Sequence, residues 1–265
     1  ACGRRSRTPS MTEPPPYLVS YAQNREDLYL WALVGHRPNG TYIDVGCNHA
    51  RFHSVTRLFY ERGWSGLNID ANPAFASEYA ERERDTFVAS GVAAEPGELT
   101  LRIYTRGDGL STFDPYTQEE HERSGLAYRE IRVPVDTLTE IARRAGVTRA
   151  DFLKIDVEGM EADVLRGLDF DVIRPTVIIV EASRHDDCVQ LLTPLDYHIE
   201  FFDGLNTYFV DNTADDVSIQ NYAERVLGAG FRTELEYTLL TRPLEGIRAA
   251  AARSVRRRVG RLLRR

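Results

Sequence analysis

Short β-branched segments alternate with stretches of helical character from Thr41 onward, and no other feature constrains the fold of this 265-residue chain as strongly. Strands are expected over residues 41–45, 66–70, 86–89, 99–104, 131–135, 152–156 and 176–181. Helices are expected over residues 54–62, 73–84, 136–144 and 159–167, the third of them capped by Asp136. Strands that alternate with helices build βαβ units and parallel sheets. The pattern predicts a Rossmann-like α/β fold with a mostly parallel seven-stranded sheet and helices on both faces. Residues 99–104 are expected to continue this sheet, and an antiparallel hairpin of residues 197–202 and 207–210 is expected to close it.

Composition divides the chain into three parts. Residues 1–16 mix arginine, serine and threonine with three consecutive prolines, which cannot supply a core, so we expect a disordered leader. Residues 17–246 contain the strand and helix pattern and are expected to form one domain. Within this domain, residues 106–129 are polar and carry three glycines and a proline. We expect them to form a long loop with a short helix, which makes them a candidate lid.

The third part, residues 247–265, has eight arginines, no acidic residue, and apolar residues at helical spacing. A basic amphipathic helix is typical of segments that bind anionic membranes or acidic partners, so we expect peripheral membrane association through Arg248–Arg265. Because the whole chain has a formal charge of −7, removing these eight positive charges leaves −15 for the rest. This negative charge argues against nucleic acid as a partner, since phosphate contacts need a basic surface.

The location of the protein follows from what the sequence lacks. No apolar run approaches the roughly 20 residues that span a bilayer, and the arginine-rich N-terminal segment has no apolar middle of the kind a secretory signal needs. Cys2, Cys47 and Cys188 are odd in number and far apart, which fits reduced thiols better than a disulfide framework or a zinc site. We therefore expect a cytoplasmic protein, with peripheral association at the inner membrane surface as an extension of this prediction.

Carboxylates stand at the ends of the first two predicted strands. Asp44 precedes Gly46 at the end of the first, and Asp70 ends the second. Open α/β sheets bind ligands at the carboxyl ends of their strands, where a glycine lets the backbone approach a ligand and Asp44 can accept hydrogen bonds from a cationic amino group. Asp70 is placed to accept hydrogen bonds from a ribose diol, although it could also cap the next helix. The first loop lacks the Gly-x-Gly-x-x-Gly set that cradles a pyrophosphate, which disfavours NAD and favours S-adenosylmethionine.

The order of motifs along the chain resembles that of the FkbM-type S-adenosylmethionine-dependent methyltransferases. The matching stretches are 20–27, 42–48, 63–66, 70–73, 110–112, 135–138, 151–161 and 164–167, of which DFLKIDVEGME at 151–161 is the most specific. The resemblance implies a class I methyltransferase fold and acceptor hydroxyls on sugars, glycolipids or polyketide-like metabolites. It also implies that the N-terminal segment packs over the cofactor. The cofactor-binding residues that follow are Gln23, Asp44, Gly46, Asn48, Asp70, Ser111 and Asp156.

The segment KIDVEG at 154–159 points to the same chemistry from its residues alone. Lys154 and Asp156 share a face of the predicted strand, and Glu158 begins the next helix, whose dipole favours an ionised carboxylate. Methyl transfer to oxygen needs a hydroxyl that is held in line with the methyl group and relieved of its proton, so Asp156 or Glu158 is the candidate base. Lys154 is the only lysine among 33 basic residues. We expect its compact ammonium to pair with Asp156 or a neighbouring acid, or to orient the substrate oxygen.

The same carboxylates have an alternative use. Asp156, Glu158 and Glu181 could together hold Mg²⁺, which takes oxygen ligands and would lower the pKa of a bound diol. In the N-terminal motif, Gln23 and the acids Glu26 and Asp27 are expected on one side of a helix.

The sequence thus predicts an S-adenosylmethionine-dependent O-methyltransferase that acts on a hydroxylated small-molecule or lipid-linked acceptor through Lys154, Asp156 and Glu158. An NAD(P)-dependent oxidoreductase is the alternative enzyme, although the chain lacks the glycine fingerprint and a Tyr-x-x-x-Lys pair. A noncatalytic Rossmann-like module that binds a membrane or partner through its arginine-rich tail is a third hypothesis. The carboxylates at several strand ends argue against it, because a fold without a ligand does not need them.

Overall fold

Seven strands form the central sheet of the computed structural model, in the order β10-β11-β9-β8-β2-β3-β4. Their bounds are Thr41–Val45 (β2), Ser65–Asp70 (β3), Thr86–Ala89 (β4), Phe152–Ile155 (β8), Val177–Glu181 (β9), Tyr197–Phe202 (β10) and Asn206–Asp211 (β11). β11 is antiparallel to both of its neighbours, whereas all other neighbouring strands are parallel. The predicted α/β sheet with a closing hairpin is confirmed. The structure describes residues 15–104, 108–181 and 185–236.

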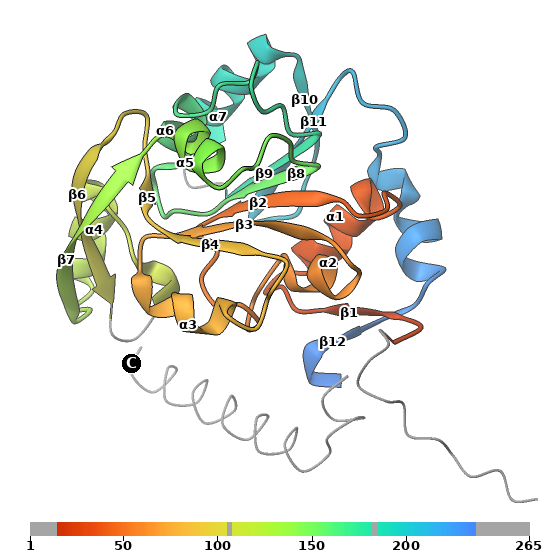
Figure 1. Cartoon of the computed structure of the whole chain (residues 1–265), viewed down its shortest axis with the longest axis horizontal. Helices are drawn as coiled ribbons and strands as arrows, with labels where there is room; N and C mark the ends of the chain where they lie inside the picture. The colour runs from red at the N-terminus through yellow and green to blue at the C-terminus, as the bar shows by residue number, and fades with distance from the viewer. Residues whose placement is uncertain (1–14, 105–107, 182–184, 237–265) are drawn as a thin grey trace, which may run out of the picture.

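Helices cover both faces of this sheet (Figure 1). Successive side chains of a strand point to opposite faces, so Ile43 and Leu153 join one core cluster while Tyr42 and Phe152 join the other. The first cluster includes residues of α5, α6 and α7, and the second includes residues of α1 and α2. The helix bounds are Glu26–Val34 (α1), Arg57–Glu61 (α2), Leu138–Arg144 (α5), Glu161–Arg166 (α6) and His185–Leu192 (α7). Burial on both faces explains why β9, VIIVE, reads as a nearly continuous apolar run.

Several helices are shorter than the sequence predicts. Residues 73–84 form a 3-10 turn, Pro73–Phe75 (η1), followed by a single helical turn, Ala76–Tyr79 (α3). The helix stops there because the side chain of Arg82 turns into the interior, where it contacts Thr56 and Asp85. Asn72, not Asp70, caps η1, since its side chain accepts from the backbone N–H of Ala74. The alternative role of Asp70 as a helix cap is therefore wrong.

Residues 99–104 do not continue the central sheet, which corrects the prediction. They belong to a separate three-stranded sheet of Gly91–Val92 (β5), Gly97–Tyr104 (β6) and Tyr128–Asp136 (β7), at the left of Figure 1. β6 and β7 pair antiparallel along eight residues, and Leu101, Ile103 and Val133 form a small core of their own. Because β7 continues through Asp136, Thr137 caps α5 instead of Asp136, accepting from the backbone N–H of Glu140.

The link between β6 and β7 contains the expected short helix. Pro115–Arg123 (α4) begins at Asp114, whose carboxylate accepts from the backbone N–H of Thr117. Proline at the first position of the helix suits this start. The other short turns are Asp108–Leu110 (η2), Thr193–Leu195 (η4), Ile219–Asn221 (η5) and the π-turn Ala223–Leu227 (η6). The lid hypothesis for this link stays a prediction.

The N-terminal motif is a strand and a turn before a helix, not one helix as predicted. Leu18–Ser20 (β1) pairs with Phe231–Thr233 (β12), and α1 starts only at Glu26. Asp27 holds the turn: its buried carboxylate accepts from the Ser20 hydroxyl and from the backbone N–H groups of Tyr21, Ala22 and Leu28. Gln23 therefore lies in the turn and not on a helical face with Glu26 and Asp27.

Two predicted segments lie outside the described residues: positions 1–14 of the leader and the whole arginine-rich tail. Among the residues that the structure does describe, no helix is long and apolar enough to cross a bilayer. Cys47 and Cys188 are both buried free thiols, as expected, while Cys2 is not described.

Candidate active site

A cavity of about 480 Å³ opens at the carboxyl ends of the central strands. It is lined by the ends of β2, β3, β8 and β9, by the turn before α1, and by the β10–β11 hairpin. All ten residues predicted to be catalytic, cofactor-binding or metal-binding line it: Gln23, Asp44, Gly46, Asn48, Asp70, Ser111, Lys154, Asp156, Glu158 and Glu181. Positions spread over 159 residues of sequence thus meet in one place, because parallel strands bring their carboxyl ends to the same edge.

Gly46 lets two loops of this edge approach closely. Its φ of +76° lies in the left-handed region, and a Cβ at this position would stand 1.8 Å from the carbonyl oxygen of Asp156. The backbone N–H of Gly46 donates to Ile69, and that of Asp156 donates to Val45. Any larger residue would push the end of β2 away from Asp156 and open the floor of the cavity.

Asp70 organises the loop after β2. One oxygen of its carboxylate accepts from the backbone N–H of Asn48 at 2.9 Å, and the other accepts from Asn72 at 2.8 Å. Burial raises the pKa of Asp70 to about 6, although these two hydrogen bonds favour the ionised form. A carboxylate has further acceptor sites besides the two used here, so Asp70 can still accept from a ligand.

Lys154 provides the positive charge of the site. Its Nζ lies 3.2 Å from Oδ2 of Asp156 and 3.5 Å from Oδ1 of Asp44, and it donates to the carbonyl oxygen of Gly46. The side chain is almost entirely buried. Burial opposes its charge, but Asp156 and Asp44 outweigh this effect and hold the pKa of Lys154 above its ordinary value. The predicted pairing of Lys154 with Asp156 is present in the structure.

Asp44 is the least satisfied acid of the cavity. The residue is 1% exposed, and neither of its carboxylate oxygens has a hydrogen-bond partner in the part of the chain described. Burial raises its pKa, while the charge of Lys154 lowers it. A buried carboxylate with unused acceptor oxygens at the wall of a cavity fits a ligand that carries N–H or O–H donors.

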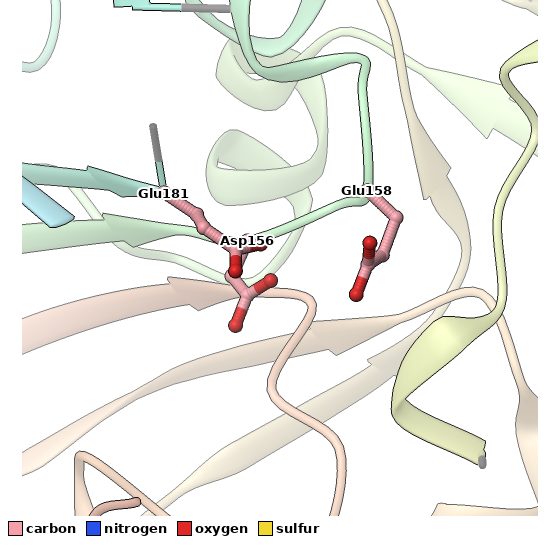
Figure 2. A group of neighbouring side chains, drawn as sticks. All are labelled: Asp156, Glu158 and Glu181. Carbon is pink, nitrogen blue, oxygen red and sulfur yellow. The ribbon is translucent and has the colours of Figure 1, made fainter. Parts of the chain in front are cut away.

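Three further carboxyl groups gather at the ends of β8 and β9. Figure 2 shows Asp156 beside Glu181, with Glu158 turned toward the same space. One oxygen from each lies within 4.8 Å of an oxygen of the other two. Burial, and then the charge of Asp156, raises the pKa values of Glu158 and Glu181, that of Glu158 to about 7. Carboxyl groups this close cannot all be ionised in a half-buried site.

Glu158 differs from its prediction. It does not begin a helix: α6 starts at Glu161, and Glu158 adopts a left-handed conformation with φ +54°. The hydroxyl of Thr112 donates to its carbonyl oxygen at 2.7 Å and fixes this turn. The helix dipole therefore does not favour its ionised form; instead, burial favours the protonated one.

The three carboxyl groups also match the oxygen ligands that Mg²⁺ prefers. However, the ammonium of Lys154 already lies within 3.2 Å of Asp156 and compensates part of their charge. A divalent cation would have to share the site with this ammonium.

Sequence reasoning did not assign two buried polar residues of the cavity to the site. Glu26 and Asn206 both line the cavity and are almost entirely buried, and Asn206 Nδ2 approaches Oε1 of Glu26 at 3.5 Å. Their local patterns indicated only a helix N-terminus and a hairpin turn. Ser90 and β5, which follow β4, also line the cavity, and the rule that ligands bind at strand ends could have identified them.

Comparisons with known proteins give a consistent set of matches. Residues 44–213 match the family described as Methyltransferase FkbM domain. Methyltransferase 1 of Beauveria bassiana (strain ARSEF 2860) is 30% identical over 171 residues, covering 56% of this chain and 68% of that protein.

Solved structures align over about three quarters of the chain. Methyltransferase FkbM from Methylobacillus flagellatus KT aligns with 16% identity and a TM-score of 0.44, covering 74% of this chain and 48% of that one. The present chain thus spans about half the length of that protein. Precorrin-6y C5,15-methyltransferase from Geobacter metallireducens GS-15 aligns with 12% identity and a TM-score of 0.41, covering 75% of this chain and 97% of that one.

Proposed function

The chain belongs to the FkbM methyltransferase family, and we propose that it transfers the methyl group of S-adenosylmethionine to a hydroxyl group of its acceptor. The observation that carries this proposal is the Lys154–Asp156 ion pair at the wall of a cavity whose other strand ends carry Asp44 and Asp70. Asp44 and Asp70 offer hydrogen-bond acceptors to the cofactor, and Asp156 offers a base to the hydroxyl of the methyl acceptor. The family membership favours methyl transfer over the oxidoreductase and noncatalytic alternatives.

The residues of the cavity fit this cofactor. The unused oxygens of Asp44 suit the amino group of the methionine part, and Asp70 suits the two hydroxyls of the ribose. Because Gly46 has no side chain, the backbone at the end of β2 can lie directly against the ligand. Gln23, Asn48 and Ser111 also line the cavity.

When bound, S-adenosylmethionine would supply an activated methyl group for transfer from its sulfur to the acceptor oxygen, leaving S-adenosylhomocysteine. Asp156 takes the proton of the attacking hydroxyl. The ammonium of Lys154, 3.2 Å away, pairs with Asp156 and fixes its orientation. We assign the base to Asp156 rather than Glu158 because Lys154 pairs with Asp156, whereas burial favours the protonated form of Glu158.

The Asp70 assignment predicts a specific pH dependence of cofactor binding. Below about pH 6 Asp70 of the free protein becomes protonated and must lose this proton to accept hydrogen bonds from the ribose. The affinity for S-adenosylhomocysteine should therefore fall by up to about tenfold for each pH unit below 6. In Asp70→Asn the affinity should be low and should lack this dependence. Calorimetric titration between pH 5 and 8 measures both.

Asp163→Asn provides the matched control, because Asp163 is a solvent-accessible acid on α6 that pairs with Arg166 outside the cavity. It should behave as the wild type at every pH. An identical pH dependence in wild type and Asp70→Asn would exclude Asp70 as the ribose acceptor.

Metal removal shows whether Asp156, Glu158 and Glu181 act without a metal or bind a divalent cation. Since the Lys154 ammonium already compensates Asp156, we expect methyl transfer to be unchanged after dialysis against EDTA. The assay is methyl transfer with labelled cofactor, before and after addition of Mg²⁺. Loss of activity in EDTA that Mg²⁺ restores would instead assign Asp156, Glu158 and Glu181 as cation ligands.

We further propose that the arginine-rich tail, residues 247–265, holds the protein at an anionic membrane, which would suit a lipid-linked acceptor. Cosedimentation with phosphatidylglycerol vesicles should be lost on raising the salt concentration and on deleting the tail. Vesicle binding that survives the deletion would contradict this proposal. A cytoplasmic location fits both the tail and the reduced thiols, and remains part of the proposal.

A further inference from the structure

We propose that residues 219–236, which we call the C-terminal brace, hold one wall of the cavity in its cofactor-binding conformation through the side chain of Arg51. This inference rests on the proposed binding of S-adenosylmethionine and names a structural element that controls that site. The brace comprises η5, η6 and β12, and it lies beyond the region matched to the FkbM family, residues 44–213. The family match therefore does not account for it.

Two irregular segments form the wall in question. The N-terminal turn, residues 21–25, and the loop after β2, residues 46–53, both contribute residues to the lining of the cavity. Three non-glycine residues in these segments have a left-handed backbone: Arg25 with φ +66°, Asn48 with φ +51° and His53 with φ +57°. Such conformations persist only where the surrounding structure holds them in place. The turn and the loop therefore depend on their neighbours for the shape of this wall.

The brace contacts the N-terminal turn directly. β12 runs parallel to β1, which precedes the turn, and the backbone N–H of Leu18 donates to the carbonyl oxygen of Gly230 at 2.9 Å (Figure 1). The guanidinium of Arg25 lies over the ring of Phe231, 5.8 Å from its centroid. Arg225 anchors the brace by donating to two carbonyl oxygens in the last turn of α1. The brace thus contacts both the strand before the turn and the helix after it.

Arg51 connects the brace to the loop after β2. Its Nε donates to Oε1 of Glu234 at 2.9 Å, and its guanidinium lies over the ring of Tyr21, 5.1 Å from the centroid. One side chain of the loop thus contacts the turn and the brace at once. A backbone bridge between Ala22 and His53 joins the same turn and loop. Arg51 itself does not line the cavity, so it acts on the cofactor through the turn and the loop and is a positioning residue.

These contacts couple the brace to cofactor binding. A ligand that binds only when the turn and the loop are ordered binds less tightly as the ordered fraction of the protein falls. By the same linkage, the bound ligand stabilises the contacts that order the two segments. Loss of the Arg51 contacts should therefore weaken cofactor binding, and cofactor binding should slow the opening of the brace.

Calorimetry and amide hydrogen exchange on the full chain, with S-adenosylhomocysteine as the ligand, test this coupling. In wild type the saturating ligand should slow exchange of the backbone amides of β1 and β12. Arg51→Met should raise the Kd by about three- to tenfold, because it removes an ion pair and a cation–π contact, and most of the slowing should be lost. Glu234→Gln, which leaves the turn and the loop unchanged in sequence, should raise the Kd in the same direction.

Arg174→Met is the matched control. Arg174 also forms an ion pair, with Asp211, and also lies over an aromatic ring, that of Tyr197. It lies outside both the cavity and the brace. Its substitution should lower the Tm of the protein but should change neither the Kd nor the effect of the ligand on exchange in β1 and β12.

The outcomes separate this inference from the function on which it rests. Failure of the wild-type protein to bind S-adenosylhomocysteine would overturn the proposed function and this inference together. With that ligand bound by wild type, either of two results would overturn the role of the brace alone. One is a Kd that is unchanged in both Arg51→Met and Glu234→Gln, and the other is exchange in β1 and β12 that the ligand does not slow.

Discussion

Asp156→Asn should lower kcat for methyl transfer by about 10²–10⁴-fold, because the amide cannot accept the proton of the attacking hydroxyl. The geometry of the site should survive, since the backbone N–H of Asp156 still donates to Val45 and the side chain keeps its size. Affinity for S-adenosylhomocysteine should change far less than kcat. Initial rates with labelled cofactor, together with a calorimetric Kd, measure the two effects separately.

Asp163→Asn is the matched control for this substitution and should keep the wild-type rate. A kcat within a few-fold of wild type in Asp156→Asn would move the role of base elsewhere. Glu158 is then the next candidate, because its carboxyl group shares the same space and its pKa is about 7.

Lys154→Met should lower the free energy of unfolding by about 3–5 kcal/mol, because it leaves buried carboxylates without their counter-ion. Asp44 is 1% exposed and has no hydrogen bond to share its charge among the described residues, so it suffers most from this loss. Urea denaturation followed by circular dichroism measures the change. Arg166→Met removes a surface ion pair with Asp163 and should cost less than about 1 kcal/mol.

Lys154→Arg separates charge from shape at the same position. A guanidinium keeps the positive charge but is too broad for the space between Asp44, Asp156 and the carbonyl oxygen of Gly46. The variant should fold and yet transfer methyl groups more slowly than wild type. Full activity in a normally folded Lys154→Arg would show that any cation suffices there.

The central sheet and the residues at its carboxyl edge could be predicted from the sequence, because both follow from the alternation of apolar strands and helices. Short, mostly apolar segments such as 152–155 and the β-branched run at 177–181 are typical of buried strands. Once these strands are parallel, the residues that follow them must share an edge, and so Asp44, Asp70 and Asp156 meet. The FkbM motifs then added the residues that no strand end indicates, such as Gln23 and Ser111.

The predictions from sequence were wrong where contacts between distant parts of the chain determine the local structure. Strand character at 99–104 was recognised, but the pairing of β6 with β7 depends on a partner some thirty residues away. The break after α3 depends on the interior position of Arg82, and the left-handed conformation of Glu158 depends on Thr112. Glu26 and Asn206 are 180 residues apart, and only the folded chain brings them to one cavity.

Side-by-side calorimetric titration of the cofactor-free protein with S-adenosylmethionine and with NAD⁺ shows whether this cavity binds S-adenosylmethionine. We expect a micromolar Kd for S-adenosylmethionine, no detectable binding of NAD⁺, and loss of S-adenosylmethionine binding in Asp70→Ala. Binding of NAD⁺ in preference to S-adenosylmethionine, or binding of neither, would contradict it.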